Sequence, residues 1–308
     1  MYAGHEVKVI TQTPSSDGGP LPFEVHRRPS AQALFRMVRW CDVVWHNGIS
    51  LRAAWPLCIA RRPWVITHIN FSSREEGGAW WAVWLKMSLA RCGTNIAISS
   101  ALLPRLPEGT RVIGNPFDDA LFGKPYSGAR TRELVFLGRL IPEKGLDLLL
   151  EALVLLGQKG IYPALTVIGA GPDEQRCRKI TAGLQHQSRI SFVGAKRGAE
   201  LAHLLSVHQV LVVPSRLVEP FGVVALEGIA CGCVAIGSDR GGLPEAIGPC
   251  GFTFPSNDVT GLAACIKNVL ADPSAAERCR AHAHSHLSRF SRRAVAEQYL
   301  QVFGEVTV

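Results

Sequence analysis

From residue 132 onward, short apolar runs alternate with segments whose apolar residues recur at helical spacing. The run at 134–137 is followed by leucines at positions 146, 149, 150, 153 and 156, which predicts a helix over 143–157. Further apolar runs stand at 165–168, 190–193, 209–213, 234–236 and 251–254. Near-continuous apolar strands separated by helices are typical of a parallel sheet that is covered on both faces. We therefore predict a doubly wound α/β domain.

The first 115 residues repeat this pattern less clearly. Apolar runs at 6–11, 43–46, 64–68 and 95–99 predict strands of a second parallel sheet. The segment 115–119, Asn-Pro-Phe-Asp-Asp, predicts a turn and a linker between domains. Ligands of open α/β sheets bind beyond the carboxyl ends of the strands, so two such domains would place a site in the cleft between them.

Composition narrows the classes of partner. The chain has 308 residues, of which 47% are hydrophobic and 19% charged, as expected of a folded protein of about two domains. Its 33 Lys and Arg against 25 Asp and Glu give a net charge of +8, which favours anionic partners. The basic residues come singly or in pairs, so we do not expect nucleic acid to be the partner.

The sequence also indicates a compartment. No apolar stretch approaches the ~20 residues that span a bilayer, and the first residues do not resemble a signal peptide. Nine scattered cysteines without a C-x-x-C pair are typical of reduced thiols and predict no metal site. We expect a cytoplasmic protein.

The loop over 138–145 carries the first candidate chemistry. Gly138 supplies a flexible turn, and Arg139 and Lys144 are cations five residues apart at the expected start of a helix. Helix N-termini present free N–H groups and partial positive charge, so the arrangement suits a phosphate or diphosphate. The alternative is a solvated loop with an ordinary helix start.

A second constellation lies at 214–228, after a predicted buried strand. Glu219 is in the loop, Glu227 follows eight residues later in the predicted helix, and Gly222 allows a ligand to approach the backbone. Carboxylates accept hydrogen bonds from vicinal hydroxyls, so together these groups would hold a sugar, a diphosphate and a ribose. Alternatively, Glu219 caps the helix and Glu227 is solvated.

Two other signals are weak or missing. Gly169-x-Gly171 lacks the third glycine of a dinucleotide-binding fingerprint, which disfavours an NAD-dependent oxidoreductase. No D-x-D occurs, so we expect side-chain cations and a helix dipole, without a metal, to neutralise a diphosphate leaving group.

Five motifs follow one another along the chain: G-R-L-x-P-E-K-G at 138–145, V-x-G-x-G-P at 167–172, F-V-G at 192–194, E-P-F-G-x-V-x-L-E at 219–227 and G-G-L-P-E at 241–245. In this order they resemble the motifs of family-four glycosyltransferases with the two-domain GT-B fold, with thinner matches upstream at 4–11 and 65–68. The resemblance implies two Rossmann-like domains facing a cleft. Residues 1–117 would be the acceptor-side domain, 118–288 the nucleotide-sugar domain and 289–308 a closing helix that crosses back.

The resemblance further implies a retaining, metal-independent glycosyltransferase. It would move a sugar from a nucleotide-diphosphate sugar to a glycan, a lipid-linked acceptor or a small molecule, in polysaccharide biosynthesis for example. A donor phosphate oxygen would deprotonate the acceptor, so no cofactor and no protein base is implied.

The site residues are carried over by position. Arg139 and Lys144 would bind the diphosphate, Glu219 the sugar hydroxyls, and Glu227 the ribose hydroxyls, while His68 would lie across the cleft near the transferring sugar. The remaining positions that the resemblance assigns to donor binding are Gly138, Gly194 in the base pocket, Ser215, and the backbone of Phe221, Gly222 and Val223.

The match at 4–7 normally follows a first strand, a Gly-rich loop and a first helix. We therefore expect the first strand and helix of the N-terminal domain to be missing, about 30–40 residues by analogy with a βαβ unit. The alternative function is a catalytically inactive GT-B protein or fragment that binds a nucleotide or a partner. A GT-B phosphorylase or a nucleotide-sugar epimerase fits less well, because the paired glutamates belong with transferases.

The segment 80–87 is aromatic, with Trp80, Trp81 and Trp84. It predicts a helix packed on the N-terminal sheet. The alternative is a contact with the acceptor or with a membrane surface, such as the inner membrane face. Arginines at 27, 28, 36, 39, 61 and 62 would suit a lipid-phosphate acceptor or an anionic leaflet.

Overall fold

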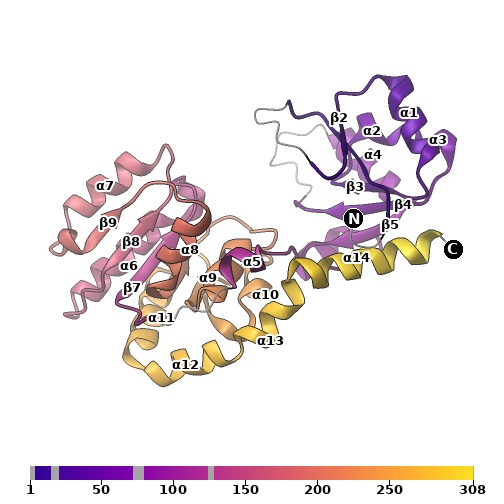
Figure 1. Cartoon of the computed structure of the whole chain (residues 1–308). Helices are drawn as coiled ribbons and strands as arrows, with labels where there is room; N and C mark the ends of the chain where they lie inside the picture. The colour runs from indigo at the N-terminus through magenta and orange to yellow at the C-terminus, as the bar shows by residue number, and fades with distance from the viewer. Residues whose placement is uncertain (1–3, 15–20, 72–79, 124–127, 308) are drawn as a thin grey trace. The chain divides into compact units, whose positions relative to one another are not determined.

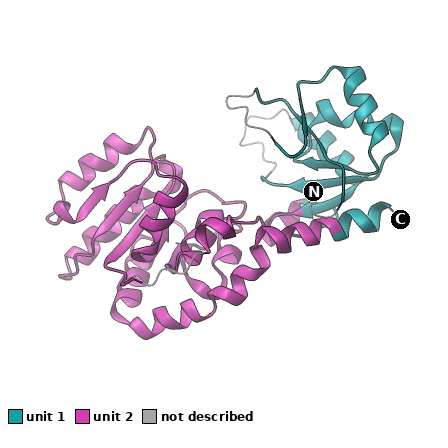
Figure 2. Ribbon diagram, viewed as in Figure 1, with its two compact units in different colours: residues 1–96, 106–110, 301–308 teal, residues 97–105, 111–300 magenta. Residues whose placement is uncertain are grey.

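The computed structural model describes residues 4–14, 21–71, 80–123 and 128–307 (Figure 1). The chain folds into two compact units (Figure 2). Unit 1 comprises residues 1–96, 106–110 and 301–308, and unit 2 comprises residues 97–105 and 111–300. Among the described residues, no helix is both long and apolar enough to cross a bilayer.

Unit 2 is built on a six-stranded sheet with the order β12-β11-β10-β7-β8-β9, and every neighbouring pair is parallel. Its central strands are almost entirely buried, as expected when helices cover both faces. This confirms the predicted α/β class. The strands are β7 Arg132–Leu137, β8 Leu165–Ile168, β9 Ile190–Phe192, β10 His208–Val213, β11 Val234–Ser238 and β12 Gly251–Phe254.

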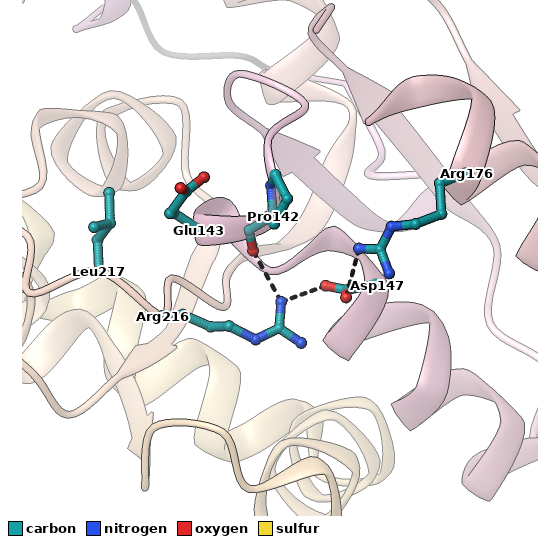
Figure 3. A pocket seen from close by; sticks show the side chains of 6 residues that line it. All are labelled: Pro142, Glu143, Asp147, Arg176, Arg216 and Leu217. Atoms are coloured by element: carbon teal, nitrogen blue, oxygen red, sulfur yellow. Dashed lines mark hydrogen bonds and ion pairs between the residues drawn. The ribbon is translucent and has the colours of Figure 1, made fainter. Parts of the chain in front are cut away.

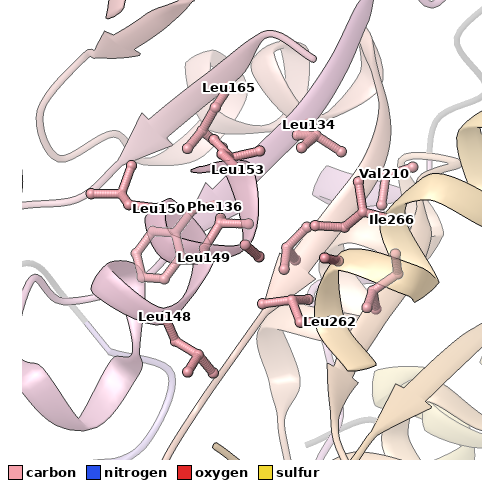
Figure 4. Packing of buried hydrophobic residues seen from close by; sticks show 14 of the residues in the cluster. Leu134, Phe136, Leu148, Leu149, Leu150, Leu153, Leu165, Val210, Leu262 and Ile266 are labelled. Carbon is pink, nitrogen blue, oxygen red and sulfur yellow. The ribbon is translucent and has the colours of Figure 1, made fainter. Parts of the chain in front are cut away.

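Helices follow these strands in alternation. Helix α6 (Leu146–Gly157) packs on the core, and its Leu149, Leu150 and Leu153 are fully buried (Figure 4). Burying each such leucine stabilises the fold by roughly 1.5–3 kcal/mol. The other helices are α7 Glu174–Ala182, α8 Gly198–Ser206, α9 Val223–Ala230, α10 Leu243–Ile247, α11 Val259–Ala271, α12 Pro273–Ala281, α13 Ala283–Leu287 and α14 Arg292–Thr307.

The helix predicted over 143–157 begins later than its pattern indicates. A short 3-10 turn, η3 (Pro142–Lys144), comes first, and Gly145 in a left-handed conformation (φ +71°) separates it from α6. A Cβ at Gly145 would lie 2.0 Å from the carbonyl oxygen of Pro214, so only glycine fits there. This contact joins the loop after β7 to the loop after β10.

The N-terminal half contains smaller sheets. Strands β3 (Val44–Asn47), β4 (Trp64–His68), β5 (Thr94–Ala97) and β6 (Arg111–Val112) form a sheet in that order, and β3 and β4 pair in parallel. Strands β1 (Lys8–Thr11) and β2 (Glu24–Arg27) form a separate parallel pair. The helices are α1 Ala31–Trp40, α2 Leu51–Ala54, α3 Leu57–Ala60, α4 Trp80–Ala90 and α5 Asp119–Phe122.

Candidate functional site

The carboxyl edge of the unit 2 sheet brings together residues from both predicted constellations. Lys144, in η3 after β7, places Nζ 2.5 Å from Oε1 of Glu219, in the loop after β10. The Ser215 hydroxyl donates to the same oxygen at 2.7 Å. The side chains of Lys144 and Glu219 are 23% and 14% exposed, so water screens this ion pair only in part. The sequence predicted these three residues as site residues without predicting that they contact one another.

The backbone also holds Glu219 in place. The N–H of Gly242 donates to the Glu219 carbonyl at 2.7 Å, and Glu219 forms an isolated parallel bridge with Gly241. Gly241 has φ +69°, and a Cβ there would lie 2.1 Å from the Glu219 carbonyl oxygen. Glu219 is therefore held through both its main chain and its carboxylate before any ligand arrives.

Arg139 supplies a second cation at this edge. It follows Gly138 in the loop after β7 and is exposed. Its guanidinium makes no hydrogen bond or ion pair with another residue in the described ranges. The loop is fixed by close backbone packing, because a Cβ at Gly169 would lie 1.9 Å from the Gly138 carbonyl oxygen. An unpaired guanidinium on a fixed loop is well suited to bind an anion.

Glu227 differs from Glu219. It lies on α9 and is half-buried, and no described residue donates a hydrogen bond to its carboxylate. Burial, and to a smaller extent the nearby carboxylate of Asp118, raise its pKa to about 7. The alternative that Glu227 is simply a solvated helical residue is wrong. A half-buried carboxylate without a donor is a polar group for which a ligand could supply hydrogen bonds.

The start of α9 lies between the two glutamates. Phe221 is buried and packs against Phe290 with ring centroids 5.4 Å apart, and Gly222 has φ +120°. Val223 begins the helix, and the first turn has no side-chain cap. The alternative that Glu219 caps α9 is therefore wrong, and the amide groups at this end remain available to an anion.

Gly194, after β9, stands in open space. Its φ is +73°, and a Cβ placed on it would have no atom within 4 Å. Its positive φ favours glycine, and the space beside it is open.

A polar network that the sequence analysis missed lies behind η3 (Figure 3). The buried carboxylate of Asp147, in the first turn of α6, accepts from Arg216 at 2.5 Å and from Arg176 at 2.7 Å. Arg216 also donates its guanidinium to the Pro142 carbonyl at 2.9 Å and its backbone N–H to the Glu143 carbonyl at 2.8 Å. These groups line a pocket of about 430 Å³.

This network ties the two loops of the site together. Burial alone would raise the pKa of Asp147, but hydrogen bonds from Arg216 and Arg176 outweigh burial and hold the pKa below its usual value. The charged carboxylate thus holds Arg216 in place, and Arg216 donates hydrogen bonds to η3, which carries Lys144. The signal in the sequence was an aspartate inside the otherwise apolar run at 146–150.

His68 is the predicted site residue that belongs to unit 1, where it ends β4. Its Nε2 lies 2.8 Å from Oδ1 of Asn95, and the Asn95 amide nitrogen donates to the carbonyls of Ala90 and Gly93. Because Oδ1 must then accept, His68 carries its proton on Nε2. Burial lowers the pKa of His68, so it is a neutral imidazole at pH 7.

Comparison with known proteins decides the family. The family model described as glycosyl transferases group 1 matches residues 119–286. The chain belongs to this family. The predicted resemblance to GT-B glycosyltransferases is thereby confirmed, and the oxidoreductase interpretation is not retained.

Curated relatives of this group 1 chain agree. Glycogen synthase of Mycobacterium tuberculosis is 37% identical over 234 residues, which cover 72% of this chain and 55% of the relative. A GDP-mannose-dependent phosphatidylinositol monomannoside mannosyltransferase of Mycolicibacterium smegmatis is 30% identical over 185 residues, or 56% of this chain and 48% of that protein. The chain spans about half the length of the curated relatives it matches.

Solved structures show the same fold. HepE of Anabaena, crystallised in complex with UDP, is 20% identical with a TM-score of 0.82, covering 98% of this chain and 100% of that chain. Sucrose-phosphate synthase of Thermosynechococcus elongatus is 23% identical with a TM-score of 0.76, covering 99% and 90%. The group 1 chain therefore has the GT-B type of parallel α/β fold that its motifs predicted.

Proposed function

We propose that this chain is a retaining, metal-independent glycosyltransferase that takes a sugar from a nucleoside-diphosphate sugar. The observation that carries the proposal is the contact of Lys144 and Ser215 with Glu219. The loop after β7 also carries the exposed Arg139, and α9 carries the carboxylate of Glu227, to which no described residue donates. A donor of this kind offers a diphosphate, a sugar and a ribose. Family membership supports the same activity.

In this proposal, cationic side chains bind the diphosphate of the donor and carboxylates bind its hydroxyl groups. Arg139 and Lys144 bind the diphosphate, and each charge-assisted contact contributes roughly 1.5–3 kcal/mol. When the diphosphate binds, the Lys144 ammonium contacts it as well as Glu219, and the Glu219 carboxylate accepts hydrogen bonds from the sugar hydroxyls. Ser215 keeps the Glu219 carboxylate oriented during this exchange, since it bonds the same oxygen as Lys144.

Glu227 binds the ribose. No described residue donates to its carboxylate, so two vicinal hydroxyls would supply donors, and they favour its charged form. Gly138 and Gly194 leave room for the diphosphate and the base, and the backbone from Phe221 to Val223 directs the helix terminus toward the sugar or phosphate. HepE was crystallised in complex with UDP, and the similar mannosyltransferase is GDP-mannose-dependent, which supports a nucleotide donor for this chain.

In the proposed reaction, the bond between the anomeric carbon and the diphosphate oxygen breaks, and a bond from the acceptor oxygen forms on the same face. The acceptor proton passes to the departing diphosphate oxygen, and Arg139 and Lys144 stabilise the negative charge that develops there. His68 donates from Nε2 to Asn95 and offers Nδ1 as an acceptor toward a sugar hydroxyl. We assign acceptor binding to residues 1–117, donor binding to residues 118–288 and the role of a closing helix to residues 289–308.

The acceptor is a glycan, a lipid-linked molecule or a small molecule, and no cofactor takes part. We place the reaction in the cytoplasm, where nucleotide sugars are available as donors.

A thermal-shift panel tests the donor site. UDP, GDP, ADP and their sugar conjugates are each titrated against wild type, Glu227→Gln and the control Glu151→Gln, which alters an exposed glutamate on α6. We expect one nucleotide to raise the Tm of wild type and of the control, with the rise largely lost in Glu227→Gln. No shift with any nucleotide would overturn the donor site, and a shift without sugar transfer to any acceptor would favour an inactive nucleotide-binding protein.

A further inference from the structure

The motif G-G-L-P-E at 241–245 has no role in the proposed transfer, yet it lies beside the loop that carries Glu219. Gly241 and Gly242 hold the Glu219 main chain, and Glu245 follows in the first turn of α10. The Oε2 atom of Glu245 accepts from the backbone N–H and from the hydroxyl of Ser100, both at 2.8 Å. The motif therefore contacts two other segments of unit 2, one at Glu219 and one at Ser100.

Ser99 connects these two segments directly. It is fully buried, and its hydroxyl donates to the Pro220 carbonyl at 2.6 Å. Its neighbour Ser100 begins η2 (Ser100–Arg105), the 3-10 helix that follows β5. Three segments of unit 2 thus bind one another in a closed ring, which we call the Glu245 ring: residues 99–100, 219–220 and 241–245.

Gly242 stands where the three segments of the Glu245 ring meet. A Cβ at this position would lie 2.5 Å from the Pro220 carbonyl oxygen and 2.8 Å from both the Phe221 Cα and the Ser99 Cβ. The φ of Gly242 is −86°, so the need for glycine comes from this packing and not from the backbone conformation. Close-packed segments transmit strain to one another, so a shift at Glu245 would reach Glu219.

A first-turn glutamate also has an ordinary role, since a negative charge stabilises the N-terminal end of any helix. Glu174, in the first turn of α7, shows this ordinary case, because its carboxylate pairs with Arg178 one turn along the same helix. By contrast, both donors of Ser100 meet on one oxygen of Glu245. The bonds of Glu245 therefore lead away from its own helix, through Ser99, to the residue next to Glu219.

We propose that Glu245 acts through the Glu245 ring as a positioning residue, which fixes the Glu219 carboxylate for the hydroxyls of the donor sugar and thereby sets which sugar the site accepts. This inference rests on the proposed function, in which Glu219 binds the sugar and other residues bind the nucleotide. Loss of Glu245 should therefore affect recognition of the sugar and spare recognition of the nucleotide.

Isothermal titration of the full chain with a nucleotide and with its sugar conjugates tests this role. The probes are UDP, UDP-glucose and UDP-galactose, whose sugars differ only in the orientation of one hydroxyl, or the corresponding ADP or GDP compounds if the thermal-shift panel selects another base. For Glu245→Ala we expect the Kd of the nucleotide to stay within about twofold, the Kd of the preferred conjugate to rise about tenfold, and the preference between the two sugars to narrow by a similar factor. Glu245→Gln keeps an oxygen that accepts from Ser100, so it should recover most of the loss.

Glu174→Ala is the matched control, and it should keep every Kd at the value of wild type. The melting curve of each variant shows whether it is folded, and Ser99→Ala, which removes the bond to Pro220, provides the test if Glu245→Ala is not. Unchanged Kd values in Glu245→Ala, or an equal rise for the nucleotide and its conjugates, would overturn the inference. Failure of the proposed function looks different, because wild type itself would then bind no nucleotide, and this inference would fall with it.

Discussion

Glu219 and Glu227 are eight residues apart, yet their carboxylates have opposite surroundings: the first has hydrogen-bond partners and the second has none among the described residues. Glu219 is paired with Lys144, bonded by Ser215 and fixed through its carbonyl by Gly242. Glu227 is half-buried without a donor among the described residues, and its pKa is raised to about 7. One end of the site is thus organised before the ligand arrives, and the other end depends on the ligand to supply hydrogen bonds.

Removing the charge pair at the organised end should have the largest effect. Lys144→Met removes a diphosphate contact and leaves Glu219 without its cation, so we expect kcat/KM for the sugar donor to fall about 10- to 150-fold. Glu219→Gln should cause a comparable loss. Steady-state kinetics with the donor identified by thermal shift measures both.

The double variant sharpens this prediction. Because Lys144 and Glu219 contact each other, Lys144→Met with Glu219→Gln should lose less than the sum of the two single losses in activation free energy. Strict additivity would mean that the ion pair has no part in the function of the site.

Asp147 supports the organised end and should have the next largest effect. Asp147→Asn removes the charge that anchors Arg216 and Arg176, so we expect the free energy of unfolding to fall by about 2 kcal/mol and the donor KM to rise.

Asp173→Asn is the matched control for Asp147. Asp173 binds Arg176 at 2.6 Å but has no contact with Arg216, so its loss should leave the donor KM unchanged. An equal rise of KM in both variants would show that Asp147 does not position the site through Arg216.

The Glu227 carboxylate should make the stability of the protein depend on pH. The unfolded chain releases the Glu227 proton near its ordinary pKa of 4.5, whereas the folded chain holds it until about 7. The free energy of unfolding therefore falls as pH rises through this window. Glu227→Gln has no buried charge to form, so its Tm should match that of wild type near pH 5 and exceed it at pH 8. The difference in the free energy of unfolding at pH 8 should be about 1–2 kcal/mol after solvent screening.

Nucleotide binding should reverse this effect. Ribose hydroxyls favour the charged carboxylate, so binding near pH 7 should release a proton from Glu227. Calorimetry in two buffers of different ionisation enthalpy measures that release, and identical heats in both buffers would contradict it.

The smallest effect is expected at Gly194. A methyl group there meets no atom within 4 Å, so Gly194→Ala should cost only about 1 kcal/mol of stability, from its positive φ. The same methyl group would enter the space proposed for the base and weaken nucleotide binding more than it weakens the fold. Isothermal titration beside thermal melting separates the two effects.

The strands of unit 2 could be predicted because they are buried on both faces and appear as continuous apolar runs. The run at 165–168 coincides with β8, and that at 251–254 with β12. Strand β2 could not be found in this way, since three of its four residues, Glu24, His26 and Arg27, are polar. The start of α6 was placed too early because the obstacle at Gly145 is the Pro214 carbonyl, far away in sequence.

The candidate site shows the same limit. Resemblance to a family located Lys144, Glu219 and Glu227, but only the fold shows that the first two are paired and the third is not. The contacts of Asp147 join residues 29 and 69 positions away, and no local pattern reports such distances. His68 was recognised by its motif, while the Asn95 amide that fixes its tautomer was missed.

The close packing of Gly145 against Pro214 has a consequence for how such sequences can diverge. Inserting one residue into either turn would shift Lys144 or Ser215 out of register with the other, so both turns should keep their length among working descendants of this chain. Gains and losses of residues should collect where the backbone is free of such contacts, as at Gly160, which has no atom within 4 Å of an added Cβ. Differences in length between members of the family should then lie mainly in the connections far from the carboxyl edge of the sheet.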